Sequence, residues 1–172
     1  MPDHPLWFRL LLDETRRRLL EESIPRTRRC LGLLSDAELW HRPNANSNSA
    51  GNLILHLCGN ARQWIVSTLG GEPDLRRRQA EFDERGPVPR GELEALLSRL
   101  DTDLRRTLDV LTPEQVLARH SVQVFEESGM AILIHVVEHF SYHVGQLTYL
   151  TKALKDLDTG YYAGQPLETP GA

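Results

Sequence analysis

Apolar residues recur along most of this chain at the three- and four-residue spacing of amphipathic helices, and the alternating pattern of strands is almost absent. The first helical stretch covers about residues 4–34. Its inner side is formed by Phe8, Leu11, Leu12, Thr15, Leu19 and Leu20. Because proline lacks an N–H and its ring clashes with the preceding turn, we expect Pro25 to kink or split this helix.

A second helix is predicted from about residue 50 to residue 69. The polar run at 43–49 before it is a loop that ends in residues suited to N-capping, and Gly70 and Gly71 stop it. Residues 72–89 are charged and contain prolines, so we interpret them as a long connection. Its arginines, Arg76–Arg78, are interpreted as a solvated loop, with binding of a phosphate or carboxylate as the alternative.

Leucines at every third or fourth position predict a third helix from about residue 90 that ends before Pro113. The leucines are Leu93, Leu96, Leu97, Leu100, Leu104, Leu108 and Leu111. Residues 114–128 have no clear periodicity, and we expect them to be irregular with a short extended piece at 121–125.

The fourth helix is predicted from near Gly129 to about Leu154. A tail rich in glycine and proline follows from Asp156 and is expected to loop over the surface. Four long helices and two long connections between helices predict an all-α four-helix bundle. A length of 172 residues suits one domain, spanning residues 1–172, with a core of its own.

Composition narrows the functional classes. A formal net charge of −4 gives no electrostatic reason to expect nucleic acid as a partner. No apolar run is long enough to cross a membrane, and the first residues lack the pattern of a secretory signal. The two cysteines, Cys30 and Cys58, do not make a disulfide framework, so a reducing cytoplasm is the expected location.

Four histidines stand out from this pattern. His135, His139 and His143 recur every four residues on the inner face of the last helix, and His56 lies in a second apolar run, residues 52–60. Imidazole is costly to bury unless it is hydrogen-bonded or bound to metal. Several imidazoles in one core therefore predict a metal site, although a single buried histidine is more often only hydrogen-bonded.

The surroundings of His56 support this interpretation. A polar stripe lies within about 40° of it on the helical wheel. Its members are Ser49, Asn52, Asn60, Gln63 and Ser67, flanked by Leu53, Leu57 and Trp64. The stripe predicts one wall of a hydrated pocket, whereas Cys58 points about 200° away from His56 and cannot join the cluster.

One competing motif is present. The segment 135–139 reads His-x-x-Glu-His, the inverted zinc-peptidase signature in which Glu138 would be the base. Such enzymes take a third ligand from a later element and need a larger fold around the site. Here the stretch after His143 contains a single glutamate, Glu168, in the expected tail. We therefore disfavour a peptidase.

Residues 48–64 and 135–146, which carry the two histidine motifs, resemble the DinB-like superfamily. The similarity extends from about Leu6 to Tyr162 and includes the Arg-x-x-Glu-Phe element at 78–82. It is closest to a branch of the superfamily without an assigned function.

The resemblance implies a four-helix bundle, often a homodimer, with a divalent ion held by His56, His139 and His143. His135 matches an upstream histidine that is not usually a ligand. Characterised relatives include transferases and isomerases that use a low-molecular-weight thiol such as bacillithiol or mycothiol. This chain departs from many relatives at Tyr142 and Val144, which leaves its particular thiol open.

Three imidazoles leave a tetrahedral ion with an open fourth position. The expected cofactor is zinc or nickel. We predict an enzyme that activates a small thiol or water, with its catalytic residues unassigned, or alternatively a non-catalytic metal- or ligand-binding bundle. Side chains expected to orient a small-molecule substrate are Asn52, Asn60, Gln63 and Gln146. Glu138 or a backbone carbonyl is expected to fix an imidazole tautomer.

Overall fold

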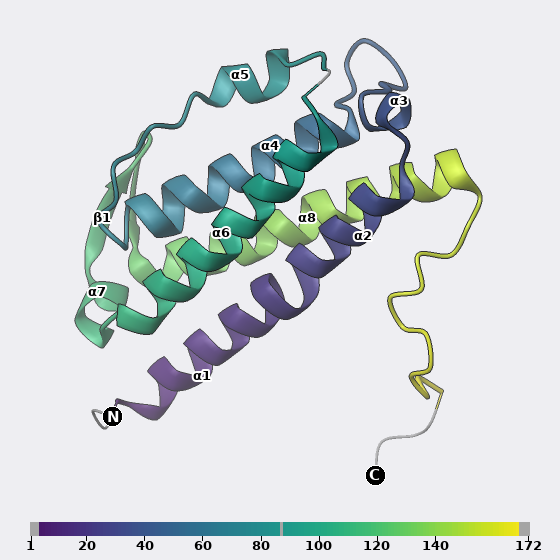
Figure 1. The fold of residues 1–172 in the computed structure, drawn as a ribbon. Coiled ribbons are helices and arrows are strands. Elements are labelled where there is room, and N and C mark those ends of the chain that lie inside the picture. The colour runs from purple at the N-terminus through teal and green to yellow at the C-terminus, as the bar shows by residue number, and fades with distance from the viewer. Residues whose placement is uncertain (1–3, 87, 169–172) are drawn as a thin grey trace.

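The computed structural model describes residues 4–86 and 88–168, and it forms a four-helix bundle (Figure 1). Four long rods make the bundle: α1, η1 and α2 joined end to end, α4 joined to η2, α6, and α8. Their bounds are α1 Leu6–Arg16, η1 Arg17–Ser23, α2 Ile24–Leu33, α4 Ala50–Ala61, η2 Arg62–Ser67, α6 Arg90–Val110 and α8 Gly129–Lys155. The shorter elements are α3 Asp36–Leu39, α5 Arg78–Asp83, α7 Pro113–Leu117, β1 Arg119–Val122 and β2 Phe125–Ser128.

The apolar faces of the four rods meet in one core. Helix α8 packs against α2, η1, α4 and η2, while α6 covers α2, α4 and η2 from the other side. The inner face of α8 is fully buried at Ile132, Leu133, Val136, Phe140 and Leu147. The face that carries the histidines of α8 therefore lies beside the most tightly packed part of the bundle.

Capping residues set the expected helix boundaries. The Ser49 hydroxyl accepts a hydrogen bond from the backbone N–H of Asn52 and starts α4, as the polar loop before it predicted. Gly71, with a φ of +74°, stands where the second helix was expected to stop. Ser128 caps the start of α8, and Asp156 ends it in the left-handed conformation.

The expectation that the first helix kinks or splits at Pro25 is wrong in its position. The backbone stays helical through residues 23–24, and the irregularity lies one turn earlier, in the π-helical segment η1. Pro25 cannot donate to the carbonyl of Glu21, and a wider turn before it accommodates its ring without breaking the rod.

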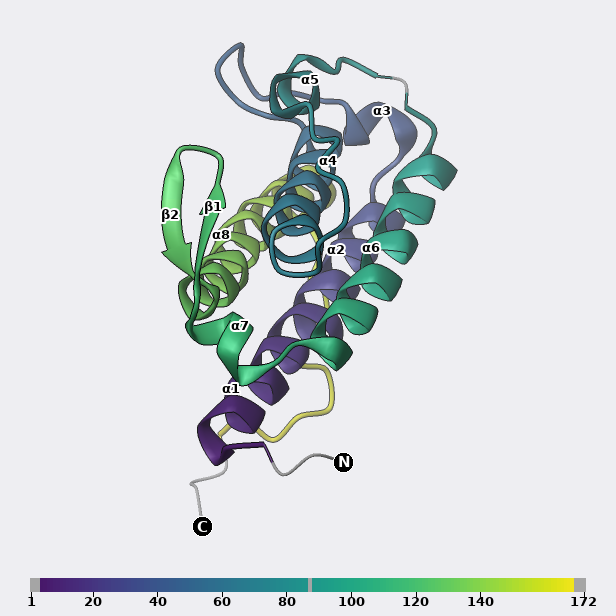
Figure 2. The same cartoon turned by 90° about the vertical axis from the view of Figure 1, so that its left-hand side faces the viewer.

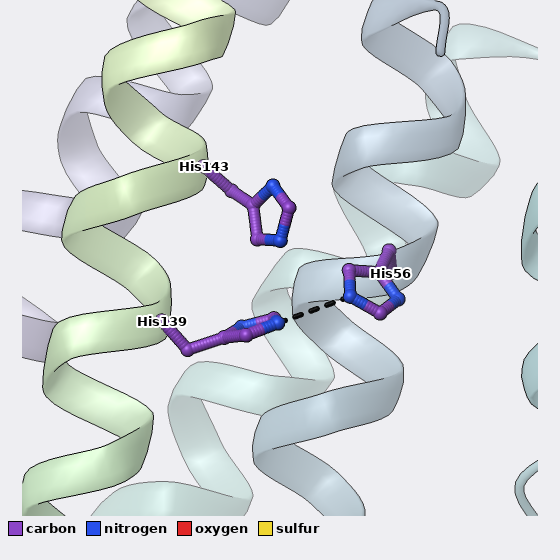
Figure 3. Close-up of side chains that lie close together, drawn as sticks. All are labelled: His56, His139 and His143. Atoms are coloured by element: carbon purple, nitrogen blue, oxygen red, sulfur yellow. Dashed lines mark hydrogen bonds between the residues drawn. The ribbon is translucent and has the colours of Figure 1, made fainter. Parts of the chain in front are cut away.

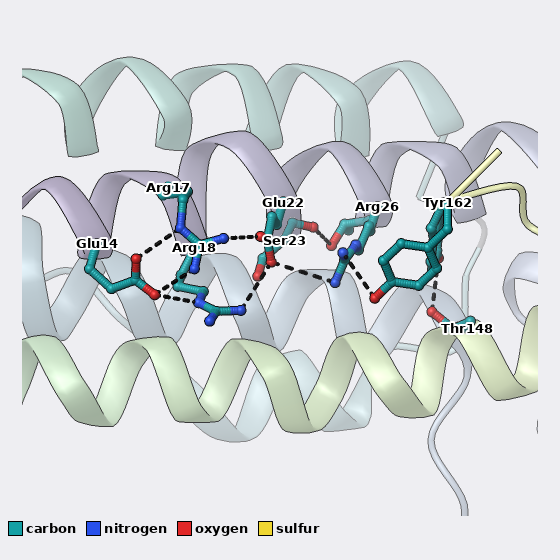
Figure 4. A network of polar contacts seen from close by, with 10 residues as sticks. Glu14, Arg17, Arg18, Glu22, Ser23, Arg26, Thr148 and Tyr162 are labelled. Carbon is teal, nitrogen blue, oxygen red and sulfur yellow. Dashed lines mark hydrogen bonds and ion pairs between the residues drawn. The ribbon is translucent and has the colours of Figure 1, made fainter. Parts of the chain in front are cut away.

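An outward-facing polar network follows this widened part of the first rod (Figure 4). Arg17 and Arg18 both pair with Glu14 and with Glu22. Hydrogen bonds from the two guanidinium groups lower the pKa of Glu14 to about 2. The network therefore covers the solvent side of the first rod at the point where its backbone leaves α-helical geometry.

The connection over residues 72–89 is more ordered than expected. It contains the short helix α5, and it lies as a strap along the outside of α4 (Figures 1 and 2). The expectation of a solvated arginine loop is wrong at Arg76, whose side chain is only 4% exposed. The side-chain amide of Asn52 holds the strap by donating to the carbonyls of Glu81 and Glu84, each at 2.9 Å.

Residues 114–128 are also not irregular. They form α7 and an antiparallel hairpin of β1 and β2, which stands beside the start of α8 (Figure 2). The extended piece expected at 121–125 is instead interrupted by the hairpin turn, where Gln123 has a φ of 54°. Alternation of apolar residues did not signal the hairpin because its strands are mostly exposed.

The tail after α8 runs back along the first rod. The Tyr161 hydroxyl lies 3.1 Å from Cys30 Sγ and 2.8 Å from the Thr148 hydroxyl, and Arg26 reaches the Tyr162 hydroxyl at 3.4 Å. Among the described residues, no helix is both long enough and apolar enough to cross a membrane.

The junction between α7 and α8 yields a stability test. A Cβ at Gly129 would lie 2.5 Å from the carbonyl oxygen of Gln115, whereas a Cβ at Gly145 would have no neighbour within 4 Å. We expect Gly129→Ala to lower the free energy of unfolding by about 1–3 kcal/mol through backbone displacement. Gly145→Ala should raise it by about 0.5–1 kcal/mol through helix propensity. Urea unfolding measures both changes, and equal midpoints for the two variants would contradict the packing described.

Candidate metal centre

Three imidazoles from two helices converge inside the bundle. His56 comes from α4, and His139 and His143 come from successive turns of α8 (Figure 3). Each offers one nitrogen, and the three nitrogens lie within 4.8 Å of one another. Ring centroids are 4.9 Å apart for His56 and His139 and 4.5 Å apart for His139 and His143. The two motifs that the sequence singled out therefore meet at one point.

Hydrogen bonds orient two of the rings. His56 Nδ1 lies 2.8 Å from a Glu81 carboxylate oxygen, and because a carboxylate only accepts, Nδ1 carries the proton. Arg76 Nη2 also lies 3.2 Å from His56 Nδ1, but we assign the tautomer from the shorter contact with Glu81. His143 Nδ1 donates to Gln146 Oε1 at 2.7 Å. Both rings are thus left with the Nε2 lone pair for the shared point.

His139 lies at the centre of the group. Its Nε2 is 3.0 Å from the Nε2 of His56. Burial, reinforced by the neighbouring His143 and His56, lowers the pKa of His139 to about 3. Burial also lowers the pKa of His143. Neutral imidazoles are the form that binds metal, so these shifts keep both rings ready to act as ligands at neutral pH.

A buried ion pair stands behind His56. Arg76 binds the Glu81 carboxylate through Nε at 2.8 Å and Nη2 at 2.9 Å. Burial alone would raise the pKa of Glu81, but the hydrogen bonds from Arg76 and His56 outweigh it and hold that pKa below its usual value. Gly59 gives this carboxylate its space, since a Cβ there would lie 2.0 Å from Glu81 Oε1.

Sequence reasoning missed this ion pair. Arg76 and Glu81 were assigned to a solvated connection, and the tautomer of an imidazole was expected to be fixed by Glu138 or a backbone carbonyl. In the structure Glu138 is exposed on α8, and Glu81 is the carboxylate at His56. The only signal in the chain was the Arg-x-x-Glu-Phe element at 78–82, which the resemblance included without assigning it a role.

Two of the three histidines, His56 and His139, line a pocket of about 390 Å³. Asn60 from the expected polar stripe also lines it. His135 also lines the pocket, stacked on Trp64 with ring centroids 3.9 Å apart, and is not part of the three-nitrogen group. Of the polar stripe predicted beside His56, Asn60 alone lines this pocket, whereas Ser49 and Asn52 are fully buried.

The other expected pocket residues have different positions. The Gln63 side chain binds Asp74, Arg76 and Gln123, and so joins η2 to the strap and to the hairpin. Tyr142 is 63% exposed, with its ring edge-on to His143 at 4.9 Å between centroids. Neither residue lines the pocket beside His139.

The donor set fits a metal ion. Two of the three imidazoles have their outer nitrogens anchored by acceptors, and the third, His139, has a buried Nδ1 without a partner among the described residues. Cys58 is not part of the group, and burial raises the pKa of its thiol to about 12. The three histidines could therefore hold a metal ion through nitrogen donors alone.

Comparison with known proteins identifies the family of the chain. The model of a family described as protein of unknown function (DUF1572) matches residues 9–161. The chain belongs to the DUF1572 family. No curated protein matches it.

Solved structures place the DUF1572 chain in the DinB-like fold. The crystal structure of YjoA, a DinB-like protein from Bacillus subtilis, superposes with a TM-score of 0.64 at 16% sequence identity, covering 87% of this chain and 94% of that one. A conserved protein from Enterococcus faecalis has a TM-score of 0.65 at 15% identity, covering 84% of this chain and 94% of its own. At these identities the likeness concerns the fold.

Alanine variants of the histidines test the ligand set. We expect His139→Ala and His143→Ala to abolish stoichiometric binding of a divalent metal, because each removes one of three converging nitrogens. His135→Ala, outside the group, should weaken binding less. Elemental analysis of protein loaded with metal and desalted provides the measurement, and equal metal content in all three variants would contradict the assignment.

The ion pair behind His56 generates a second test. We expect Glu81→Ala to weaken metal binding about 10- to 100-fold, as loss of a partner that orients a ligand does. Gly59→Ala should have a similar effect with all charges retained, because its Cβ displaces the Glu81 carboxylate. Asp83→Asn, an exposed change on the same short helix, is the control. Competition with a chromophoric chelator gives the affinities, and normal affinity in both test variants would show that Glu81 does not orient His56.

Proposed function

We propose that this protein is a metal-dependent enzyme that activates a low-molecular-weight thiol or a water molecule, as an S-transferase or a hydrolase does. The observation that carries the proposal is the pocket of about 390 Å³ that His56 and His139 help to line. A site that only stabilises a fold is usually closed by four protein ligands. Three converging nitrogens beside open space favour catalysis.

The ion, zinc or nickel in our proposal, would lower the pKa of a thiol or water bound at its open position. The residues of the chain do the rest. His56, His139 and His143 supply neutral nitrogens, and Glu81 with Arg76 keeps the proton of His56 on Nδ1. Gln146 does the same for His143. The hairpin and the strap each contribute side chains to the wall of the pocket.

The second candidate is a non-catalytic bundle in which the ion serves stability or ligand sensing. The tight hydrogen bonding around His56 favours it, since the same contacts would also stabilise the fold. The small-molecule substrate, the cytoplasmic location and the homodimer expected from the resemblance remain predictions.

A screen for turnover separates the two candidates. Protein loaded with zinc or with nickel is assayed for conjugation of cysteine and other small thiols to a chromogenic electrophile, and for ester and amide hydrolysis. We expect metal-dependent turnover in one class and its loss in His139→Ala, which lacks the central nitrogen. The metal-free protein is the matched control. Absence of turnover in every class, together with a large fall in melting temperature in chelator, would favour the non-catalytic bundle.

A further inference from the structure

The pocket beside the histidines is built by four different parts of the chain. Its lining residues come from the α4–η2 rod, from the first half of α8, from the hairpin and from the strap, and they include His56 and His139. The aromatic side chains Trp64, His135 and Phe125 line one side, with Trp64 stacked on His135 and 6.1 Å from Phe125 between ring centroids. Such a wall accepts the apolar body of a small ligand.

Two arginines line this pocket, and they differ in their partners. Arg76 is neutralised by two hydrogen bonds to Glu81. Arg78 makes no ion pair or hydrogen bond with any residue in the described part of the chain, and its guanidinium lies over the ring of Phe82 at 4.9 Å. Stacking on an aromatic ring anchors a guanidinium and leaves its N–H groups available to a planar anion.

The acidic residue in the same pocket is Glu127 on β2. It forms no ion pair with Arg78 in the ranges that the structure describes, so the positive charge of Arg78 is not cancelled by contact. Asn60 and Trp64, both at most 5% exposed, have a carbonyl oxygen and an indole N–H without partners in those ranges. Two residues that line the pocket therefore each have a buried polar atom that the described part of the protein does not satisfy.

We propose that Arg78 is the carboxylate-binding residue of this pocket, and that the ligand is a small carboxylate with an apolar or thiol-bearing body reaching toward His56 and His139. The thiol part of this inference rests on the proposed function. The carboxylate is inferred from Arg78, and the apolar body from the aromatic wall. Because the guanidinium is exposed, screening limits its effect on affinity to about fivefold.

The first arm of the test uses cobalt-loaded protein. Binding of mercaptoacetate and of mercaptoacetamide is followed by the thiolate-to-cobalt absorption band. The two thiols differ in acidity, so the ratio of their Kd values is compared between variants, where that difference is constant and cancels. Relative to wild type, we expect Arg78→Gln to shift the ratio about fivefold against the acid and Arg78→Lys to shift it less. Arg77→Gln, the same charge change at the adjacent position outside the pocket, should leave the ratio at its wild-type value.

The second arm needs neither metal nor thiol. Phenylacetate and phenylacetamide are titrated into the metal-free protein, and the indole N–H signal of Trp64 is followed by NMR, with Trp7 and Trp40 as internal references. We expect tighter binding of the acid in wild type, loss of that preference in Arg78→Gln, and tighter acid binding in Glu127→Gln, which removes a repulsive charge.

The two arms separate two kinds of failure. If no cobalt–thiolate band forms while phenylacetate is still preferred, the activation of a thiol is wrong and the carboxylate site stands. If phenylacetate and phenylacetamide bind equally to wild type, or if Arg77→Gln shifts the mercaptoacetate ratio as far as Arg78→Gln, the assignment of Arg78 is overturned.

Discussion

Burying imidazole in a helical core requires a partner for its ring nitrogens, and the site in this bundle depends on how that requirement is met. His56 is 4% exposed, and its Nδ1 proton goes to Glu81, a carboxylate that is itself buried and held by Arg76. The chain of contacts turns the other nitrogen of His56 toward α8. Without it, the ring would have no fixed tautomer and its lone pair no fixed direction.

Because of this requirement, the helices and the connections contribute different residues to the site. The rods supply the histidines that could hold a metal ion, because a spacing of four residues on α8 places His139 and His143 one turn apart on one face. The partners come from the strap, which can approach α4 closely only where Gly59 leaves room for the Glu81 carboxylate. Gly59 lies one turn after His56 on the same side of α4, and the space that it leaves is as necessary to the contact with Glu81 as the imidazole itself.

The rods and the meeting of the histidines could be predicted from the sequence because both are periodic. Helical spacing places His56 and the histidines of α8 on inward faces whatever the loops do. The strap could not be predicted in the same way. Arg76 and Glu81 lie in a charged run, and nothing in composition distinguishes a buried ion pair from a solvated one. The hairpin turn at Gln123 was missed for a related reason, because its strands lack an apolar alternation. The kink expected at Pro25 is absent because the π-helical segment before it accommodates the proline ring.

The two connections that sequence reasoning underestimated are joined to each other at the site. The Gln63 side-chain oxygen accepts from Arg76 of the strap at 2.9 Å and from Gln123 of the hairpin at 2.7 Å. Arg76 in turn holds Glu81, which orients His56. The hairpin and the strap are therefore linked to the Nδ1 of His56 through an unbroken series of direct hydrogen bonds, and Nε2 of the same ring is the nitrogen that faces His139. The position of Gln123 and the orientation of His56 belong to one contiguous network, which is the physical requirement for one to affect the other.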